Sequence, residues 1–144
     1  MNKPFGSQLL FVTPVFALAA VLIACRNLPA PIDADLEPLQ GHWEGDGAGG
    51  RCHIDVTGNT LRYRAGTNWW KTTFILPAGT EPRQLHARIE GSSPPTNGIG
   101  TVVFAIFKIE NDTLTLAEID GADQPPESFD AAASRYTLRR FRPR

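Results

Sequence analysis

The residues best suited to acid–base or metal chemistry in this 144-residue chain are its three histidines, His42, His53 and His86. None belongs to a close pair such as His-x-His or His-x-x-x-His, which would bring two ring nitrogens to one metal ion. His53 and Asp55 share a face of an expected strand, but one such pair on a strand is more typical of a surface contact than of a catalytic couple. No Gly-x-Ser-x-Gly elbow is present. We therefore expect no metal, no cofactor and no enzyme activity.

A second group of candidate residues combines aromatic rings with positive charge. Trp69 and Trp70 are followed by Lys71, and Arg62 and Arg64 lie one expected hairpin earlier. Because adjacent residues of a strand point to opposite faces, one tryptophan faces inward and the other outward. Two interpretations remain open. Either Trp70 lines a cavity mouth and Trp69 lies with the basic residues on a binding surface, or both rings are packed, one in the core and one under a loop.

Residues 1–24 have the features of an export signal. Lys3 is followed by an apolar run, Leu9–Ile23, of about fifteen residues, which is short for a membrane-spanning helix of about 20. The run ends at Leu22-Ile23-Ala24-Cys25, which resembles the bacterial lipobox. The resemblance implies that the Cys25 thiol receives a diacylglycerol, that the chain is cleaved just before it, and that the new amino terminus is acylated. The alternatives are an uncleaved anchor and a secreted protein with an incidental cysteine.

Residues 25–38 are expected to form a lipidated cysteine, Cys25, followed by a tether. It is rich in Pro, Ala and Asp and has no periodicity, which is typical of an extended linker. Arg26 stands where many Gram-negative inner-membrane lipoproteins have aspartate. By that resemblance we expect the protein in the cell envelope, lipid-anchored to the outer membrane and facing the periplasm. Three acyl chains anchor firmly, because each buried methylene contributes about 0.8 kcal/mol.

Residues 39–144 predict one all-β domain. Eight segments have strand character and are separated by Gly, Pro, Asn or Asp clusters: 39–46, 51–57, 60–65, 69–76, 84–90, 101–109, 113–119 and 135–142. Antiparallel strands in hairpin succession close naturally into an eight-stranded up-and-down barrel, which leaves no sheet edge exposed. The interior of such a barrel is either filled by side chains or holds one small ligand.

The ends of this domain carry a closing motif. Gly41 and Trp43 form a Gly-x-Trp in the first strand, and Arg140 lies in the last. This arrangement is typical of small closed barrels of the lipocalin type. We expect the Trp43 ring to lie across the barrel end, with the Arg140 guanidinium stacked on it and donating hydrogen bonds to carbonyls.

Alternation along the strands also assigns the interior. The inward aromatic residues are expected to contact a ligand, and they are Tyr63, Trp70, Phe74 and Phe104. Cys52 falls on the apolar face of its strand and is interpreted as a small core residue. The run Thr101–Ile109 is apolar on both faces, so its outer side must be covered as well.

The whole domain resembles small lipocalin-like domains of planctomycetes and other bacteria, for which no activity is established. The matching segments are Leu39–Trp43, Gly58–Leu61, Asn111–Leu116, Pro125–Phe129 and Tyr136–Arg140. Since 14 basic residues nearly balance 15 acidic ones, we expect no nucleic-acid partner. Three functions come into question: a lipid-anchored barrel that binds a small apolar ligand, an envelope interaction protein with a filled barrel that binds a protein partner, and an enzyme. An enzyme is the least favoured, because it would need a convergent set of polar residues and the sequence shows none.

Overall fold

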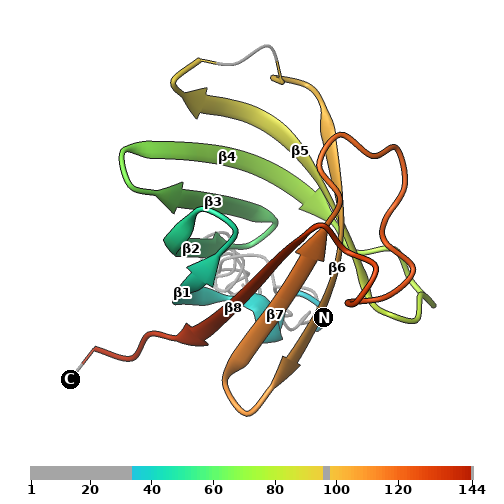
Figure 1. The fold of residues 1–144 in the computed structure, drawn as a ribbon. Coiled ribbons are helices and arrows are strands. Elements are labelled where there is room, and N and C mark those ends of the chain that lie inside the picture. The colour runs from blue at the N-terminus through green and yellow to red at the C-terminus, as the bar shows by residue number, and fades with distance from the viewer. Residues whose placement is uncertain (1–33, 96–97, 144) are drawn as a thin grey trace, which may run out of the picture. The chain divides into compact units, whose positions relative to one another are not determined.

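The computed structural model describes residues 34–95 and 98–143. These residues form an all-β barrel in which each strand pairs antiparallel with the next, and β1 pairs with β8 to close it (Figure 1). A short 3-10 turn, η2 (Glu37–Leu39), precedes the first strand. The strands are β1 (Gly41–Gly47), β2 (Gly50–Thr57), β3 (Thr60–Ala65), β4 (Asn68–Ile75), β5 (Gln84–Ser93), β6 (Val102–Glu110), β7 (Thr113–Glu118) and β8 (Ser134–Arg140). The predicted eight-stranded up-and-down barrel is confirmed.

Two tight turns set the register of the neighbouring strands. Thr57 pairs with Thr60 across the loop of Gly58 and Asn59, where Gly58 has a φ of +57°. In the β6–β7 turn, Asn111 and Asp112 both have positive φ, which short polar side chains tolerate better than others. Each turn therefore has residues compatible with its backbone, and the hairpins follow from the local sequence.

One end of the barrel is closed by Trp43 and Arg140. The Trp43 ring is fully buried, and the Arg140 guanidinium carbon lies 4.2 Å from its centroid. Arg140 donates hydrogen bonds to the carbonyls of Gln40 (2.5 Å) and Pro38 (2.7 Å), while the Trp43 indole donates to Leu39 O at 2.8 Å. Stacking and hydrogen bonding thus join β8, β1 and η2 into one lid, with the geometry that the sequence predicts.

The segment just before β1 is part of this lid. Leu39 is buried and Leu36 packs against the core. The tether predicted over 25–38 therefore ends too late, because its last residues bury apolar surface and supply a carbonyl to Arg140. The rest of that tether, Cys25 included, and the predicted signal peptide 1–24 lie outside the described residues.

The half of the barrel next to the lid is filled. Its core includes four buried side chains from β4, β6, β7 and β8, namely Phe74, Phe107, Leu114 and Leu138.

Among the described residues, no helix is long and apolar enough to cross a membrane.

The outer side of β6 and β7 is covered by the chain itself. Ile106 and Ala117 pair across these strands and are fully buried although they face away from the interior. The long loop between β7 and β8 runs beside β6 in Figure 1, its Pro126 is buried, and its Phe129 ring lies 5.6 Å from Lys108 Nζ. The loop therefore supplies the cover that the two-sided apolar pattern requires.

Candidate ligand site

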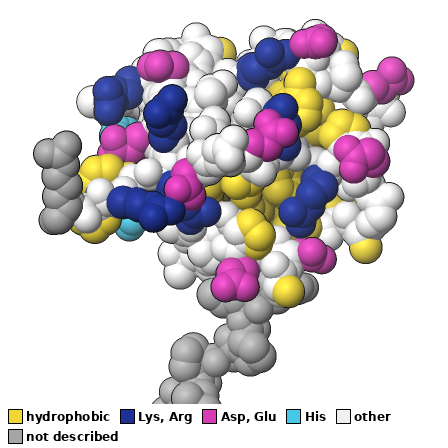
Figure 2. All heavy atoms as spheres, turned by 90° about the horizontal axis from the view of Figure 1, so that it is seen from below, with side chains coloured by type: hydrophobic (Ala, Val, Ile, Leu, Met, Phe, Trp, Pro, Cys, Tyr) yellow, Lys and Arg dark blue, Asp and Glu magenta, His cyan; other side chains and the backbone are white. Residues whose placement is uncertain are grey.

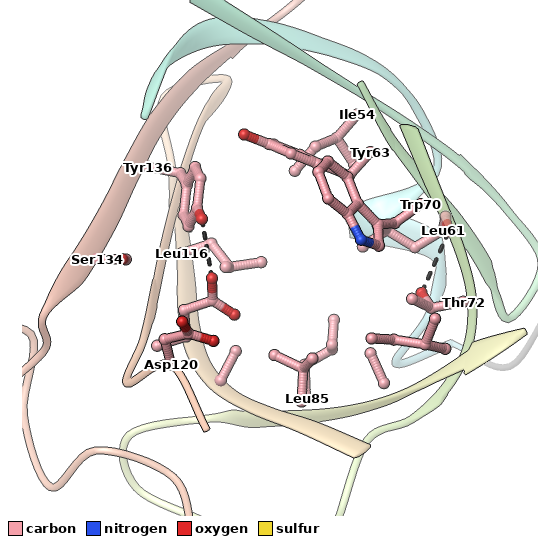
Figure 3. A pocket seen from close by; sticks show the side chains of 15 residues that line it. Ile54, Leu61, Tyr63, Trp70, Thr72, Leu85, Leu116, Asp120, Ser134 and Tyr136 are labelled. Atoms are coloured by element: carbon pink, nitrogen blue, oxygen red, sulfur yellow. Dashed lines mark hydrogen bonds between the residues drawn. The ribbon is translucent and has the colours of Figure 1, made fainter. Parts of the chain in front are cut away.

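The half of the barrel away from the lid contains a cavity of about 390 Å³ (Figure 3). Its volume falls in the range of about 300–1,000 Å³ that is usual for small-molecule sites. Inward residues of seven strands and one loop residue line it: Ile54, Leu61, Tyr63, Trp70, Thr72, Leu85, Ala87, Ile89, Val103, Ala105, Leu116, Glu118, Asp120, Ser134 and Tyr136. The barrel is thus filled at one end and hollow at the other.

The apolar walls of the cavity follow from strand alternation. Leu85, Ala87 and Ile89 alternate along β5 and line the cavity from that strand. Val103 and Ala105 line it from β6, where small side chains leave space that larger ones would fill. These residues offer no hydrogen-bonding side chain, so this wall suits the apolar part of a ligand.

Three aromatic rings enclose the cavity on its other side. Tyr63 pairs with Trp70 across β3 and β4, and their ring centroids lie 5.6 Å apart. Tyr136 meets Tyr63 edge to face at 5.7 Å. In Figure 3 the Trp70 indole reaches into the opening, with its nitrogen turned toward the cavity. Contacts between the rings restrict their movement, so the wall they form is largely preorganised.

A polar cluster lies where β7 ends and β8 begins. The Tyr136 hydroxyl donates a 2.8 Å hydrogen bond to Glu118 Oε1, and Asp120 and Ser134 line the cavity beside them. Burial raises the pKa of Glu118, the Asp120 charge raises it further, and the bond from Tyr136 partly opposes this. Burial next to Glu118 also raises the pKa of Tyr136, so the phenol stays protonated and remains the donor.

Comparison of the chain with protein-family models, curated proteins and solved structures finds no significant match.

Of the four predicted ligand-contact residues, Tyr63 and Trp70 line the cavity. Phe74 faces inward but is buried in the filled half of the barrel. For Phe104 the prediction is wrong: it pairs with His86, and their rings meet edge to face 4.8 Å apart on the outer face of β5 and β6. Since Val103 and Ala105 are the inward residues of β6, Phe104 cannot contact a ligand in the cavity.

The acidic residues of the cavity were not among the predicted site residues. Leu114 and Leu116 point inward from β7, so the same alternation places Glu118 inward. That signal was present in the sequence. Asp120 follows the end of β7, in a loop where alternation no longer assigns a direction.

The predicted surface group lies on the outer face of β3 and β4. The Arg62 guanidinium carbon is 4.9 Å from the Trp69 centroid, and Lys71 is exposed. Arg64 is bound to Asp55 at 3.1 Å, so its charge is already paired. Trp69 and Trp70 therefore face opposite sides of the sheet, and Arg62 with Trp69 is the stacked pair of this surface.

The histidines take part in local contacts. His42 contacts Asp55, and His53 Nδ1 lies 3.3 Å from Glu44 Oε1 across β1 and β2, so the suspected His53–Asp55 couple does not form. Burial lowers the pKa of His86. Within residues 34–95 and 98–143, no group of three His, Cys, Asp or Glu side chains is placed to hold a metal ion.

Charges of both signs are mixed on the molecular surface. Figure 2 shows one face, on which basic and acidic side chains alternate around a central group of hydrophobic ones. Among the described residues, Arg51 is bound to Glu44 and Arg142 to Asp112. The face in Figure 2 therefore has no extended region of one sign.

Proposed function

We propose that this protein is a lipid-anchored binding protein of the cell envelope that holds a small, largely apolar ligand in the hollow half of its barrel. The observation that carries the proposal is the cavity of about 390 Å³, with its continuous apolar wall on β5 and β6. Each Å² of apolar ligand surface removed from water contributes roughly 25 cal/mol, so a ligand gains affinity in proportion to the apolar surface that it buries against this wall.

Preorganisation supports the same proposal. The cavity lies between paired strands of a closed barrel, and the filled half with its Trp43–Arg140 lid forms a rigid base. A ligand entering such a site orders few side chains, so little of its binding free energy is lost to conformational entropy.

The envelope location rests on the sequence. Ala24 and Cys25 supply the small residue and the thiol that lipidation requires, and Arg26 favours the outer membrane. A barrel anchored in this way would meet its ligand in the periplasm or at the membrane surface.

Native mass spectrometry of the full chain, released from detergent micelles in the gas phase, tests the proposal. The denatured mass should match the chain from Cys25 onward plus a diacylglycerol and one acyl chain. The native mass should exceed the denatured mass by a non-covalent adduct of a few hundred daltons. A denatured mass without lipid would overturn the anchor, and a native mass equal to the denatured mass would count against a bound ligand.

The stacked Arg62–Trp69 pair with the exposed Lys71 supports a second candidate, a protein partner that binds the outer face of β3 and β4. The two candidates predict different losses. Trp70→Ala should weaken the binding of a ligand in the cavity, whereas Trp69→Ala should weaken the binding of a protein partner to the outer face.

A further inference from the structure

Polar and apolar groups are segregated within the cavity. The carboxylates of Glu118 and Asp120 and the hydroxyls of Ser134 and Tyr136 come from the end of β7, the loop after it and the start of β8. The side chains from β5 and β6 are all apolar. A ligand that satisfies both walls must have one polar end and an apolar body, and the polar end must face β7 and β8.

The polar wall has unused acceptor capacity. Glu118 Oε1 accepts from Tyr136, whereas Glu118 Oε2 has no hydrogen-bond partner among the described residues. Asp120 is exposed, and its carboxylate accepts no hydrogen bond and forms no ion pair within that part of the chain. A carboxylate accepts hydrogen bonds and cannot donate them, so a ligand group that replaces water at these oxygens must be a hydrogen-bond donor.

No basic side chain compensates this negative charge. None of the fifteen residues that line the cavity is Lys, Arg or His. Arg135 lies between Ser134 and Tyr136 on β8, but it points outward, where it contacts the Phe129 carbonyl and binds Asp130 at 2.9 Å. The only residues of the cavity lining that carry a formal charge are therefore the two acidic ones.

We infer that the ligand is a cationic amphiphile, a protonated amine on an apolar body, whose ammonium group contacts Glu118 and Asp120 while its body lies against β5 and β6. This inference rests on the proposed ligand-binding function. An ammonium group supplies both the charge and the donors that the wall lacks. The Trp70 and Tyr63 rings flank the same opening and are attractive surfaces for a cation as well.

The same arrangement discriminates against anionic amphiphiles. The head of a fatty acid would place a third carboxylate beside two others in a partly dehydrated site, where like charges repel more strongly than in water. Repulsion by a like charge is an effective source of specificity, because it lowers the affinity for anionic ligands without lowering the affinity for cationic ones.

Three probes of equal chain length isolate the role of the head group: octylamine, octanol and octanoate. Each is titrated by calorimetry into the full chain held in lipid nanodiscs at neutral pH, and the heat from empty nanodiscs is subtracted. We expect octylamine to bind at least about tenfold more tightly than octanol, and octanoate to bind most weakly. In the double variant Glu118→Gln with Asp120→Asn, octylamine should lose this advantage while octanol binding stays unchanged.

A charge-reversal variant gives an independent test. Ser134→Lys places an ammonium group at the polar wall, and the preference should shift from octylamine toward octanoate. Circular dichroism of each variant verifies that the barrel is folded.

The outcomes separate the inference from the function on which it rests. Octanol or octanoate binding as tightly as octylamine would overturn the charge preference and leave the cavity site in place. A preference that survives in the double variant would equally overturn it. If no probe binds to the folded chain, both the inference and the proposed function fail.

Discussion

The ring of Tyr136 occupies the space in front of Gly47. A Cβ atom at position 47 would lie 2.6 Å from Tyr136 Cε1 and still closer to Cδ1, so only glycine allows this contact. Gly47 is the last residue of β1, and its missing side chain lets Tyr136 reach Glu118. The geometry of the polar wall thus depends on a glycine that does not line the cavity.

Gly47→Ala should therefore displace Tyr136 and disturb the cavity. Overpacking of this kind costs about 1–3 kcal/mol, and we expect that loss in the free energy of unfolding measured with urea. Octylamine binding should weaken as well, since the Tyr136–Glu118 bond is lost. Gly49→Ala is the matched control, because position 49 lies in the neighbouring turn, where an added methyl group would have no other atom within 4 Å. Equal effects of the two substitutions would contradict the argument.

Arg140→Ala should destabilise the lid. It removes the stacking on Trp43 and leaves the carbonyls of Pro38 and Gln40 without their donor, for a loss of about 2–3 kcal/mol in the free energy of unfolding. Arg139→Ala is the control, because its exposed side chain has no hydrogen bond or ion pair within the described residues. Urea unfolding of both variants decides the point, and a loss below about 0.5 kcal/mol for Arg140→Ala would show that the lid depends on other contacts.

The sequence predicts the barrel and its lid because both follow from short-range rules. Turn residues separate the strands, alternation assigns Trp70 inward and Trp69 outward, and the Gly-x-Trp motif with a late arginine marks the closed end. These signals depend on neighbouring residues and on one pair of chain ends. They can therefore be recognised in the sequence without knowledge of how the side chains pack.

The contents of the barrel depend on longer-range packing. Phe104 could not be assigned correctly because Thr101–Ile109 is apolar on both faces, so alternation within it is hidden. A bulge opposite Lys71 and Thr72 also changes the register of β5 beyond Ile89, and the strand continues to Ser93 rather than ending at Glu90. Whether eight strands enclose a cavity depends on which inward residues are small, such as Ala87 and Ala105, and on where they meet in space.

Cys52 should resist chemical modification in the folded protein. The thiol is fully buried, and burial together with the Asp46 charge raises its pKa, so both access and thiolate content are low. We expect no labelling by iodoacetamide under native conditions and complete labelling in urea. Peptide mass spectrometry of the labelled chain provides the readout, and rapid native labelling would show that β2 opens on the time scale of the reaction.

Glu118→Gln should make the ligand-free protein more stable at neutral pH. Because burial raises the folded-state pKa of Glu118 above its ordinary 4.5, the protonated form is favoured in the barrel. The raised pKa of Glu118 stabilises the folded protein fully at pH values below the unfolded-state pKa. This stabilisation is lost as the pH rises through the folded-state pKa. Glutamine resembles the protonated form at every pH, so its advantage in thermal unfolding should be present at neutral pH and vanish near pH ~4. If Glu118→Gln does not raise the unfolding temperature at neutral pH, the Glu118 carboxylate is well solvated in the folded protein.

The affinity for a cationic ligand should have the opposite pH dependence. Octylamine stays protonated well beyond neutral pH, so the pH dependence of its attraction to the site follows the ionisation of Glu118. Because the pKa of Glu118 is raised above 4.5, its carboxylate takes up a proton as the pH falls toward that value, and octylamine affinity should decline with a midpoint above 4.5. Tyr136 and Tyr63 also interact with Glu118, but their pKa values are raised, and they stay neutral throughout this range. Calorimetric titrations over a pH series, with octanol as the uncharged control, measure the midpoint. A parallel decline for octanol would trace the effect to unfolding of the barrel instead of protonation of the site.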